Sequence, residues 1–272
     1  MPILRMMRWI RGGRRRRRAR AASRPFPPAW RGIIEQRVGL WQRLPAADRL
    51  ELLGHILVFI DEKRFEGCGG LEITDEVRLT IAAQACILLL HRQTQYFPAL
   101  RSILVYPDEY VAPAAEEHES GVVVEDHEPR AGESWAEGSL VLSWRDVLAG
   151  SADASSGENV VLHEFAHQID DEWGLSSADP NEAQSEEARQ WARTFRRAFE
   201  RFEREVRRGR GTVIDPYGAT DEAEFFAVVT EMFFEQPAEL RVHDPELYGR
   251  WSRFFGQNPL SWAGGRGGDQ PK

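Results

Sequence analysis

Apolar residues recur with the period of an α-helix in several long segments of the chain. The pattern predicts helices at residues 46–64 and 75–91, the second of them capped by Asp75. It also predicts a long charged helix at residues 182–206 and a final helix at residues 241–255. The core-facing stripe of the 182–206 helix consists of Trp191, Phe195, Phe199 and Phe202. Such an aromatic stripe is typical of packing rather than of a cofactor site.

Three short segments have the composition of β-strands and are separated by acidic loops. They are residues 103–106, 121–124 and 140–144. Because the helical segments are longer and more numerous, we expect an α+β fold that is predominantly helical, with a small sheet.

Composition favours one compact domain. A chain of 272 residues, 42% hydrophobic and 29% charged, is long enough to bury a full core and is ordinary for a soluble protein. We expect a single domain at residues 33–262, with a disordered tail at 1–32 and a flexible tail at 263–272. The apolar run at 82–90 is far shorter than the roughly 20 residues that a membrane-spanning helix needs. The two cysteines lie in unlike surroundings and predict no disulfide framework, which fits a reducing cytosol.

Charge is distributed very unevenly along the chain. Residues 1–24 hold ten Arg and no acidic residue, so the rest of the chain has 25 basic and 43 acidic residues, a net charge of −18. This acidic body argues against a nucleic-acid groove in the main domain and favours basic peptides or partners. The arginine run at 14–18 has two interpretations: it binds nucleic acid or anionic lipid, or it is a solvated tail or an over-extended start of the chain.

Residues 163–167 read His-Glu-Phe-Ala-His and carry the clearest chemical signal. On a helix, His163 and His167 lie one turn apart on the same face, about 6 Å from each other, so both can bind one metal ion. Glu164 leaves the helix beside this pair, where it can take a proton from a metal-bound water and pass it to a leaving amine. This arrangement is typical of zinc hydrolases.

The residues before the motif support a helix. Ser155 and Glu158 have the spacing of a capping box, and the apolar residues 160–162 follow directly. We therefore expect the motif on a helix that Ser155 caps.

A catalytic zinc ion takes three protein ligands, so one more is required. The segment after Asp221 is apolar on nearly every side, which predicts a buried helix capped by Asp221. Within it Glu224 and Glu231 lie two turns apart, and a buried carboxylate needs a partner or a metal. We favour Glu224 as the ligand, with Asp221 as the alternative. Glu231 or Asp170 would hold an imidazole N–H in the outer shell.

These segments resemble a known family. The sequence His-Glu-Phe-Ala-His-Gln-Ile-Asp at 163–170 and the segment Asp-Pro-Tyr-Gly-Ala-Thr-Asp-Glu-Ala-Glu-Phe-Phe-Ala-Val-Val-Thr-Glu-Met-Phe-Phe at 215–234 are similar to the Mlc titration factor A family of bacterial zinc peptidases. Shorter likenesses lie at 104–107 and 132–144. The resemblance covers roughly residues 33–262.

The resemblance implies a zincin-like, gluzincin-type core with the small sheet beside the motif helix. It implies that His163, His167 and Glu224 bind Zn²⁺ and that Glu164 is the general base. A family tyrosine corresponds to Tyr217, whose phenol could donate to the oxyanion that forms during hydrolysis. The alternative for Tyr217 is a buried side chain that anchors the turn at residues 215–216.

Two functions follow from the resemblance. The first is a cytoplasmic zinc peptidase, aminopeptidase-like in its preference for short peptides, that also binds the glucose-responsive repressor Mlc. The second is a regulatory module that sequesters the repressor, with zinc organising the surface and hydrolysis incidental. Residues 139–143 precede the motif helix and are the candidate strand for pairing with a peptide substrate, unless they form an interior strand with no free edge.

Overall fold

The computed structural model describes residues 13–108, 132–135 and 138–266. Within them the fold is α+β and mostly helical, as predicted. The expected strand at 121–124 and the last six residues of the chain lie outside the described residues.

Four short strands form one mixed sheet in the order β1-β2-β4-β3. Strands β1 (Arg64–Gly67), β2 (Ser102–Tyr106) and β4 (Ser139–Ser143) run parallel, with Ile103 opposite Leu140 in the β2–β4 register. Strand β3 (Gly132–Trp135) is antiparallel to β4 and lies at the edge. The expectation that residues 139–143 present a free edge is therefore wrong, because β2 and β3 pair with both sides of β4.

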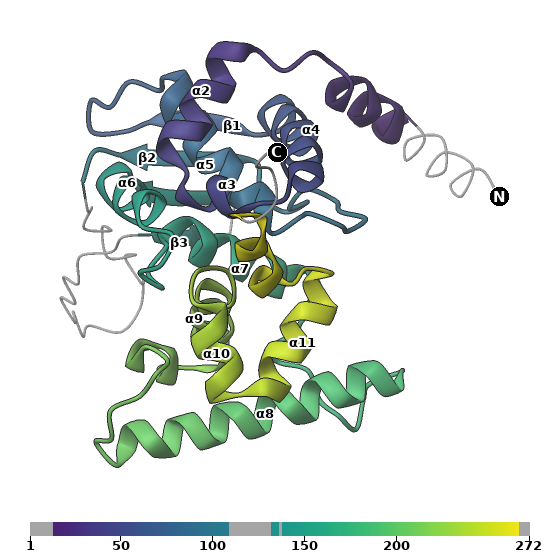
Figure 1. The fold of residues 1–272 in the computed structure, drawn as a ribbon, viewed down its shortest axis with the longest axis vertical. Helices are drawn as coiled ribbons and strands as arrows, with labels where there is room; N and C mark the ends of the chain where they lie inside the picture. The colour runs from purple at the N-terminus through teal and green to yellow at the C-terminus, as the bar shows by residue number, and fades with distance from the viewer. Residues whose placement is uncertain (1–12, 109–131, 136–137, 267–272) are drawn as a thin grey trace, which may run out of the picture.

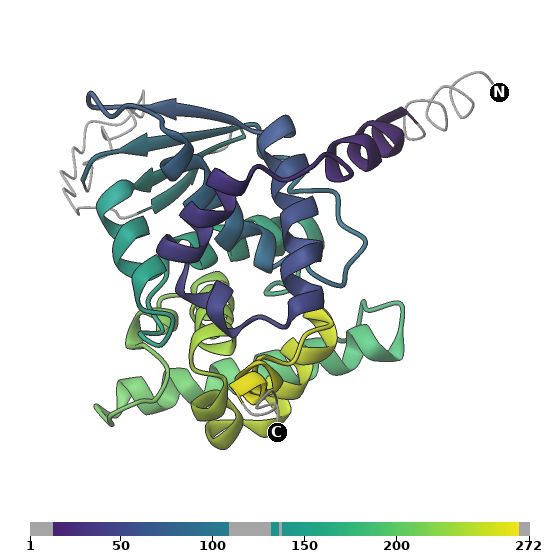
Figure 2. The same ribbon diagram turned by 45° about the horizontal axis from the view of Figure 1, so that its top comes forward.

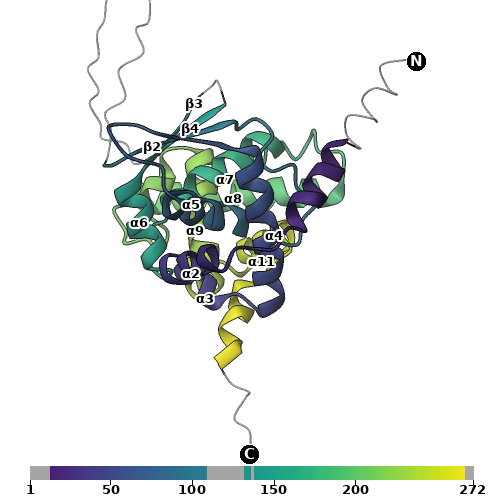
Figure 3. The same ribbon diagram turned by 90° about the horizontal axis from the view of Figure 1, so that it is seen from above.

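Most helices pack on one face of this sheet or on each other (Figures 1, 2 and 3). The first half of the chain supplies a helix at residues 13–22, α2 (Pro28–Arg37), α3 (Gly39–Arg43), α4 (Ala46–Glu62), α5 (Asp75–Ile87), α6 (Trp144–Ala152) and α7 (Val160–Trp173). The second half supplies α8 (Glu186–Arg207), α9 (Glu222–Glu235), α10 (Pro237–His243) and α11 (Pro245–Phe255), with short 3-10 helices at η1 (Pro216–Ala219) and η2 (Pro259–Arg266). Helix α8 crosses the end of the molecule opposite the sheet (Figure 1).

Helix α9 is the centre of the second half. Its residues from Phe225 to Glu235 are all buried, and it packs against α7 along its length. Aromatic rings join α8 and α11 to it: Trp191 stacks on Trp251 with ring centroids 4.8 Å apart, and Trp251 Nε1 donates to Thr230 Oγ1 of α9 at 3.0 Å. The predicted aromatic stripe of α8 thus packs into the core, and Phe199 at its margin is partly buried.

Two of the predicted helices differ from the observed ones for local reasons. Helix α5 is capped by the Thr74 hydroxyl, which accepts from Val77 N, and Asp75 is its first residue. The single helix expected at 241–255 is two helices, because Asp244 caps α11 and Pro245 lacks the N–H that would continue α10.

The N-terminal segment also differs from the expectation of a disordered tail at 1–32. Residues 13–22 form a helix, and α2 starts at Pro28. The Arg18 guanidinium binds both carboxylate oxygens of Glu62 at 2.8 Å, and Ala21 is 1% exposed. These contacts tie the segment to the domain. In the part of the chain that the structure describes, no helix is both long enough and apolar enough to cross a membrane.

Candidate metal centre

Helix α7 carries His163 and His167 on one face. It begins after Asn159, whose Oδ1 accepts from Leu162 N at 3.1 Å, and ends at Gly174 in the left-handed conformation (φ 59°). The motif is on a helix, as predicted, but Ser155 does not cap it. Ser155 lies five residues before Val160, where the helix begins, and its hydroxyl donates to Asp153 Oδ1 at 2.6 Å.

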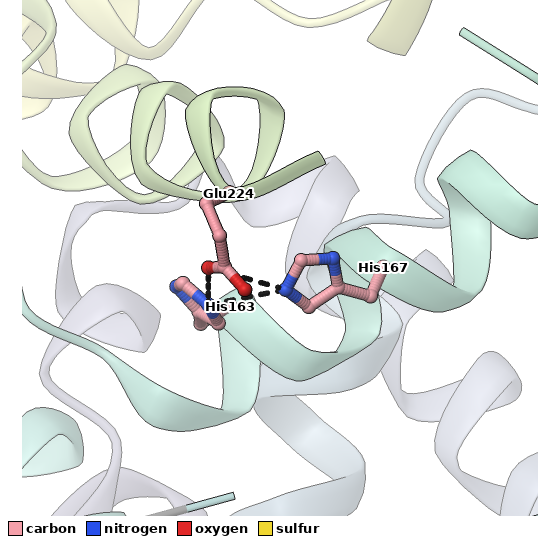
Figure 4. Close-up of side chains that lie close together, drawn as sticks. All are labelled: His163, His167 and Glu224. Atoms are coloured by element: carbon pink, nitrogen blue, oxygen red, sulfur yellow. Dashed lines mark hydrogen bonds and ion pairs between the residues drawn. The ribbon is translucent and has the colours of Figure 1, made fainter. Parts of the chain in front are cut away.

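Helix α9 carries Glu224 in its first turn. Asp221 caps this helix as predicted, with Oδ1 accepting from Ala223 N at 2.8 Å and from Glu224 N at 2.9 Å. The cap fixes where the first turn starts, and the Glu224 side chain projects from it toward α7 (Figure 4).

The two helices bring His163, His167 and Glu224 to one point. Glu224 Oε2 lies 3.0 Å from His163 Nε2 and 3.6 Å from His167 Nε2, and the two Nε2 atoms are 3.2 Å apart. Ligand atoms of a tetrahedral zinc ion with bonds of about 2.0 to 2.1 Å are about 3.3 Å apart. The three distances lie around this value, and two imidazole nitrogens with one carboxylate oxygen are a donor set typical of catalytic zinc. Among the described residues this is the one group of three that could hold a metal ion.

Glu231 lies behind His163. Its Oε1 is 2.7 Å from His163 Nδ1, and its other oxygen accepts from the backbone N–H of Asn159. A carboxylate in this position accepts a hydrogen bond from Nδ1–H, so that Nε2 is the nitrogen that faces Glu224 and His167 and can bind a metal ion.

Asp170, the other carboxylate considered for the outer shell, has different partners. It accepts from Ser176 N at 2.7 Å and from Ser176 Oγ, and so holds the loop that follows α7.

Glu164 lies inside the protein next to the three grouped side chains. It is 6% exposed. Burial raises the pKa of Glu164 to about 7; the positive charges of His163 and His167 oppose the rise, and the carboxylates of Glu224 and Glu231 add to it. A carboxyl group with a pKa near 7 can both accept and donate a proton at neutral pH.

Tyr217 in η1 faces the same group from solvent. Its ring centroid is 6.1 Å from that of His163, and the residue is 56% exposed. A buried Tyr217 anchoring the turn is therefore excluded. That turn is held by Asp215 Oδ1, which accepts from Tyr217 N at 2.8 Å.

Comparison with known proteins identifies the family. Residues 13–256 match the model of the family described as Glucose-regulated metallo-peptidase M90. The chain belongs to this M90 family.

Curated relatives agree with this assignment. Mlc titration factor A of Escherichia fergusonii is 30% identical over 235 residues, which cover 86% of this chain and 87% of that protein. Mlc titration factor A of Klebsiella pneumoniae is 32% identical over 204 residues, covering 74% of this chain and 76% of the relative. The uncharacterized protein slr2042 of Synechocystis is 38% identical over 239 residues, or 88% and 87% of the two chains.

In this M90 member the grouped side chains shift one another's pKa strongly. Burial lowers the pKa of His163, but its bonds to Glu224 and Glu231 outweigh burial and raise the pKa to about 10. Burial raises the pKa of Glu224, but hydrogen bonds from His163 and His167 outweigh it and lower the pKa to about 2. The three side chains therefore form an ionic cluster. Its carboxylates stabilise positive charge between them, either as a proton on His163 or as a bound metal ion.

A second group of buried polar residues lies behind the candidate centre, and little in the sequence indicated this group. The Asn159 amide donates to Gln84 Oε1 and to Glu235 Oε1, both at 2.8 Å. Glu235 also accepts from Gly157 N at 2.9 Å. Since Asn159 N bonds Glu231, this network reaches His163. The one available signal was Glu235 itself, a second acidic residue four positions after Glu231 in a buried helix.

Close packing fixes Asn159 in place. At Gly150 of α6, an added Cβ would lie 2.9 Å from Asn159 Cα and 3.0 Å from Glu158 O. A side chain there would push α6 away from the start of α7.

Proposed function

We propose that this protein is a zinc-dependent peptidase in which His163, His167 and Glu224 bind the metal. The observation that carries the proposal is the convergence of two imidazole nitrogens and one carboxylate oxygen at distances of 3.0 to 3.6 Å. Membership of a metallopeptidase family supports it. A zinc ion held there would lower the pKa of a bound water and polarise the carbonyl of the scissile bond.

Glu164 moves the proton. Its buried carboxyl group, with a pKa of about 7, takes a proton from the attacking water and then delivers it to the leaving amine. Glu231 holds the Nδ1 proton of His163 and so keeps the imidazole oriented with Nε2 toward the metal. Tyr217 supplies a phenol on the exposed side of His163, where it can donate to the oxygen that gains negative charge.

The substrate is an extended peptide that binds along β3. Among the strands that the structure describes, β3 lies at the sheet edge, and it contacts α7, which carries the motif. An edge strand offers unpaired backbone groups, and a peptide can pair with them as an added strand. Short peptides with a free amino terminus are the class that the family resemblance favours.

A regulatory role accompanies the peptidase activity. Relatives covering most of this chain are named Mlc titration factor A. We infer that this protein likewise binds a repressor of the Mlc type in the cytoplasm. The alternative function is binding alone, with the metal organising the surface.

Glu164→Gln tests the catalytic proposal. The variant should lose hydrolysis of a peptide library by about 10² to 10⁴-fold while its zinc content equals that of the wild type, because the proton carrier is removed and the ligands stay. The matched control is Glu172→Gln, which makes the same change at an exposed position of the same helix and should retain full activity.

Metal analysis decides between the outcomes. Unchanged hydrolysis by Glu164→Gln would exclude Glu164 as the proton carrier. The zinc peptidase proposal is wrong if the wild-type protein carries no zinc after purification without chelator and gains no activity when zinc is added. If the zinc-loaded wild type captures an Mlc-type repressor but hydrolyses no peptide, only the binding function remains.

A further inference from the structure

The loop at residues 91–97, between α5 and β2, has an unfavourable backbone at both of its ends. His91, Tyr96 and Phe97 have positive φ angles of 60°, 57° and 52°. Residues with a Cβ atom rarely adopt this left-handed conformation, and they keep it only where surrounding contacts hold it. The contacts at the two ends of the loop therefore decide whether it stays in place.

The first end of the loop is held to α4 by His91. Its Nε2 lies 3.2 Å from Asp48 Oδ1, and its Nδ1 lies 3.5 Å from Glu51 Oε2. The backbone N–H of His91 donates to Glu51 Oε1 at 2.9 Å. Both nitrogens of an imidazolium carry a proton, whereas a neutral ring would turn a lone pair toward one of the two carboxylates. The arrangement therefore fits the protonated form of His91.

The other groups around His91 are few and differ in sign. The C-terminal end of α11 lies against it, since an added Cβ at Gly256 would lie 3.5 Å from His91 Cβ. A helix C-terminus carries partial negative charge and favours a cation. The opposing group is His55 of α4, because a positive charge on either histidine disfavours one on the other. Among the described residues, the ion pairs of the His91 ring are those with Asp48 and Glu51.

The second end of the loop is held by His55. Its Nδ1 lies 2.7 Å from the Tyr96 hydroxyl, and its Nε2 lies 3.3 Å from Glu51 Oε1. Burial lowers the pKa of His55, and the hydrogen bond and charge of Glu51 oppose this shift. The neutral ring accepts from the Tyr96 hydroxyl and donates Nε2–H to Glu51. Glu51 therefore contacts the groups that hold both ends of the loop.

The loop ends behind the motif helix. The centroid of the Phe97 ring lies 4.7 Å from that of Phe165, which stands between the two motif histidines on α7. Lys63 Nζ donates to the Phe97 carbonyl at 2.6 Å. Burial lowers the pKa of Lys63 to about 8, so this side chain remains mostly charged up to pH 7.5. Release of the loop would thus uncover the back of α7.

A small pocket separates the middle of the loop from α7. Its lining includes Arg92 and Gln95 of the loop and Ile169 and Trp173 of α7. Arg92 also holds the loop, with its guanidinium 4.1 Å from the centroid of the Phe254 ring. This contact does not change near neutral pH, because arginine stays charged. The pH-dependent contacts of the loop are therefore at its ends.

We propose that residues 91–97 form a pH-sensitive latch, which protonated His91 closes by pairing with Asp48 and Glu51 of α4. Loss of the His91 proton removes the charge that attracts the two carboxylates, and the loop then opens more often. Histidine side chains change charge between about pH 5 and 8, so the latch is closed at the acidic end of this range and loosened at the other. The latch does not depend on a metal ion in the candidate centre.

Amide hydrogen exchange of the full chain tests the proposal. The backbone N–H groups of His91, Tyr96 and Leu100 are hydrogen-bonded and report on the loop. Their protection factors, which correct for the intrinsic pH dependence of exchange, should be about three- to tenfold higher at pH 5.5 than at pH 7.5, the effect of losing two partly exposed ion pairs. Amides in the middle of α9 report on global unfolding and serve as the internal reference.

His91→Asn removes the titrating ring. Asparagine adopts positive φ readily, and the His91 side chain is 39% exposed, so the fold should be kept. The protection factors of this variant should be equal at the two pH values. Tyr96→Phe removes the bond to His55 and should lower protection by the same factor at both pH values. The matched control, His243→Asn at the end of α10, should keep the wild-type ratio.

Three results would overturn the latch. The first is a wild-type loop that is equally protected at pH 5.5 and 7.5. The second is a His91→Asn variant that keeps the wild-type ratio. The third is a change in the loop that only matches the change in the α9 amides, because the whole domain and not the loop would then respond to pH.

Discussion

At the scale of single residues, the proposed metal centre depends on both ring nitrogens of His163. Nε2 faces Glu224 and His167, while Nδ1 faces Glu231. Glu231 accepts from Nδ1 and so sets the tautomer of the ring, whereas Glu224 faces Nε2 on the side where a cation would bind. These two acidic residues of α9 are therefore not interchangeable. Tyr217 differs from all of these because its side chain is largely exposed and borders the centre from outside.

Tyr217→Phe should reduce kcat by about a hundredfold, because it removes one donor to the developing oxyanion. KM and zinc content should change little. Steady-state kinetics with a cleaved peptide, together with metal analysis, measure both. Tyr248→Phe serves as a control: it removes the hydroxyl by which Tyr248 of α11 donates to Asn258 Oδ1 and should lower thermal stability without lowering kcat. A Tyr217→Phe enzyme with wild-type kcat would exclude the donor role.

At the scale of elements, the start of α7 is joined to the middle of α9. Asn159 caps α7 through Oδ1, donates its amide to Glu235 and Gln84, and gives its backbone N–H to Glu231. The residue that begins the motif helix therefore also holds the carboxylate behind His163. Movement of this cap would move His163, which we propose as a metal ligand.

Asn159→Ala should lower the free energy of unfolding by about 1 to 3 kcal/mol, since it removes a cap and leaves buried polar groups without partners. It should also weaken zinc binding, measured by competition with a chromogenic chelator. Ser185→Ala removes the corresponding cap of α8, where Ser185 Oγ accepts from Ala188 N at 3.1 Å. That control should lose about 1 kcal/mol and keep the wild-type zinc affinity. Equal zinc affinity in both variants would show that the cap has no part in positioning His163.

At the scale of the whole molecule, the centre couples titration to folding. The pKa of Glu235 is raised to about 7 by burial, with the amide of Asn159 opposing, and that of Glu164 is also about 7. A carboxyl group with a raised pKa stabilises the folded state fully when the pH is below its ordinary pKa of 4.5. This stabilisation is lost as the pH rises through 7. The raised pKa of His163 favours folding below 6.5, and this contribution is lost as pH rises through about 10. The pKa of Glu224 is lowered to about 2, so its ionised carboxylate stabilises the folded state above pH 4.5. This stabilisation is lost only as the pH falls from 4.5 toward 2.

Metal-free protein should therefore have a lower Tm at about pH 8 than at about pH 5. Zinc should raise Tm more at the higher pH, because the ligands must release their protons to bind it. Thermal unfolding in chelator and in excess zinc at the two pH values measures both effects. A zinc-induced rise in Tm that is larger at the acidic pH would contradict this coupling.

The sequence by itself predicted the motif helix with its histidine pair and most of the main elements. The i, i+4 histidines are adjacent on any helix, and the apolar run after Asp221 required burial of that helix, so the histidine pair and the helical character followed from local periodicity. Local reasoning left Asp221 as an alternative third ligand, and the family resemblance favoured Glu224. Tertiary structure decided what local patterns cannot encode. Pairing with β2 and β3 made β4 interior, and α7 begins after Asn159, which packs closely against Gly150 of α6, rather than after Ser155. The choice of Glu231 as the partner of His163 Nδ1 likewise depends on how α9 lies against α7, a contact between residues 68 positions apart.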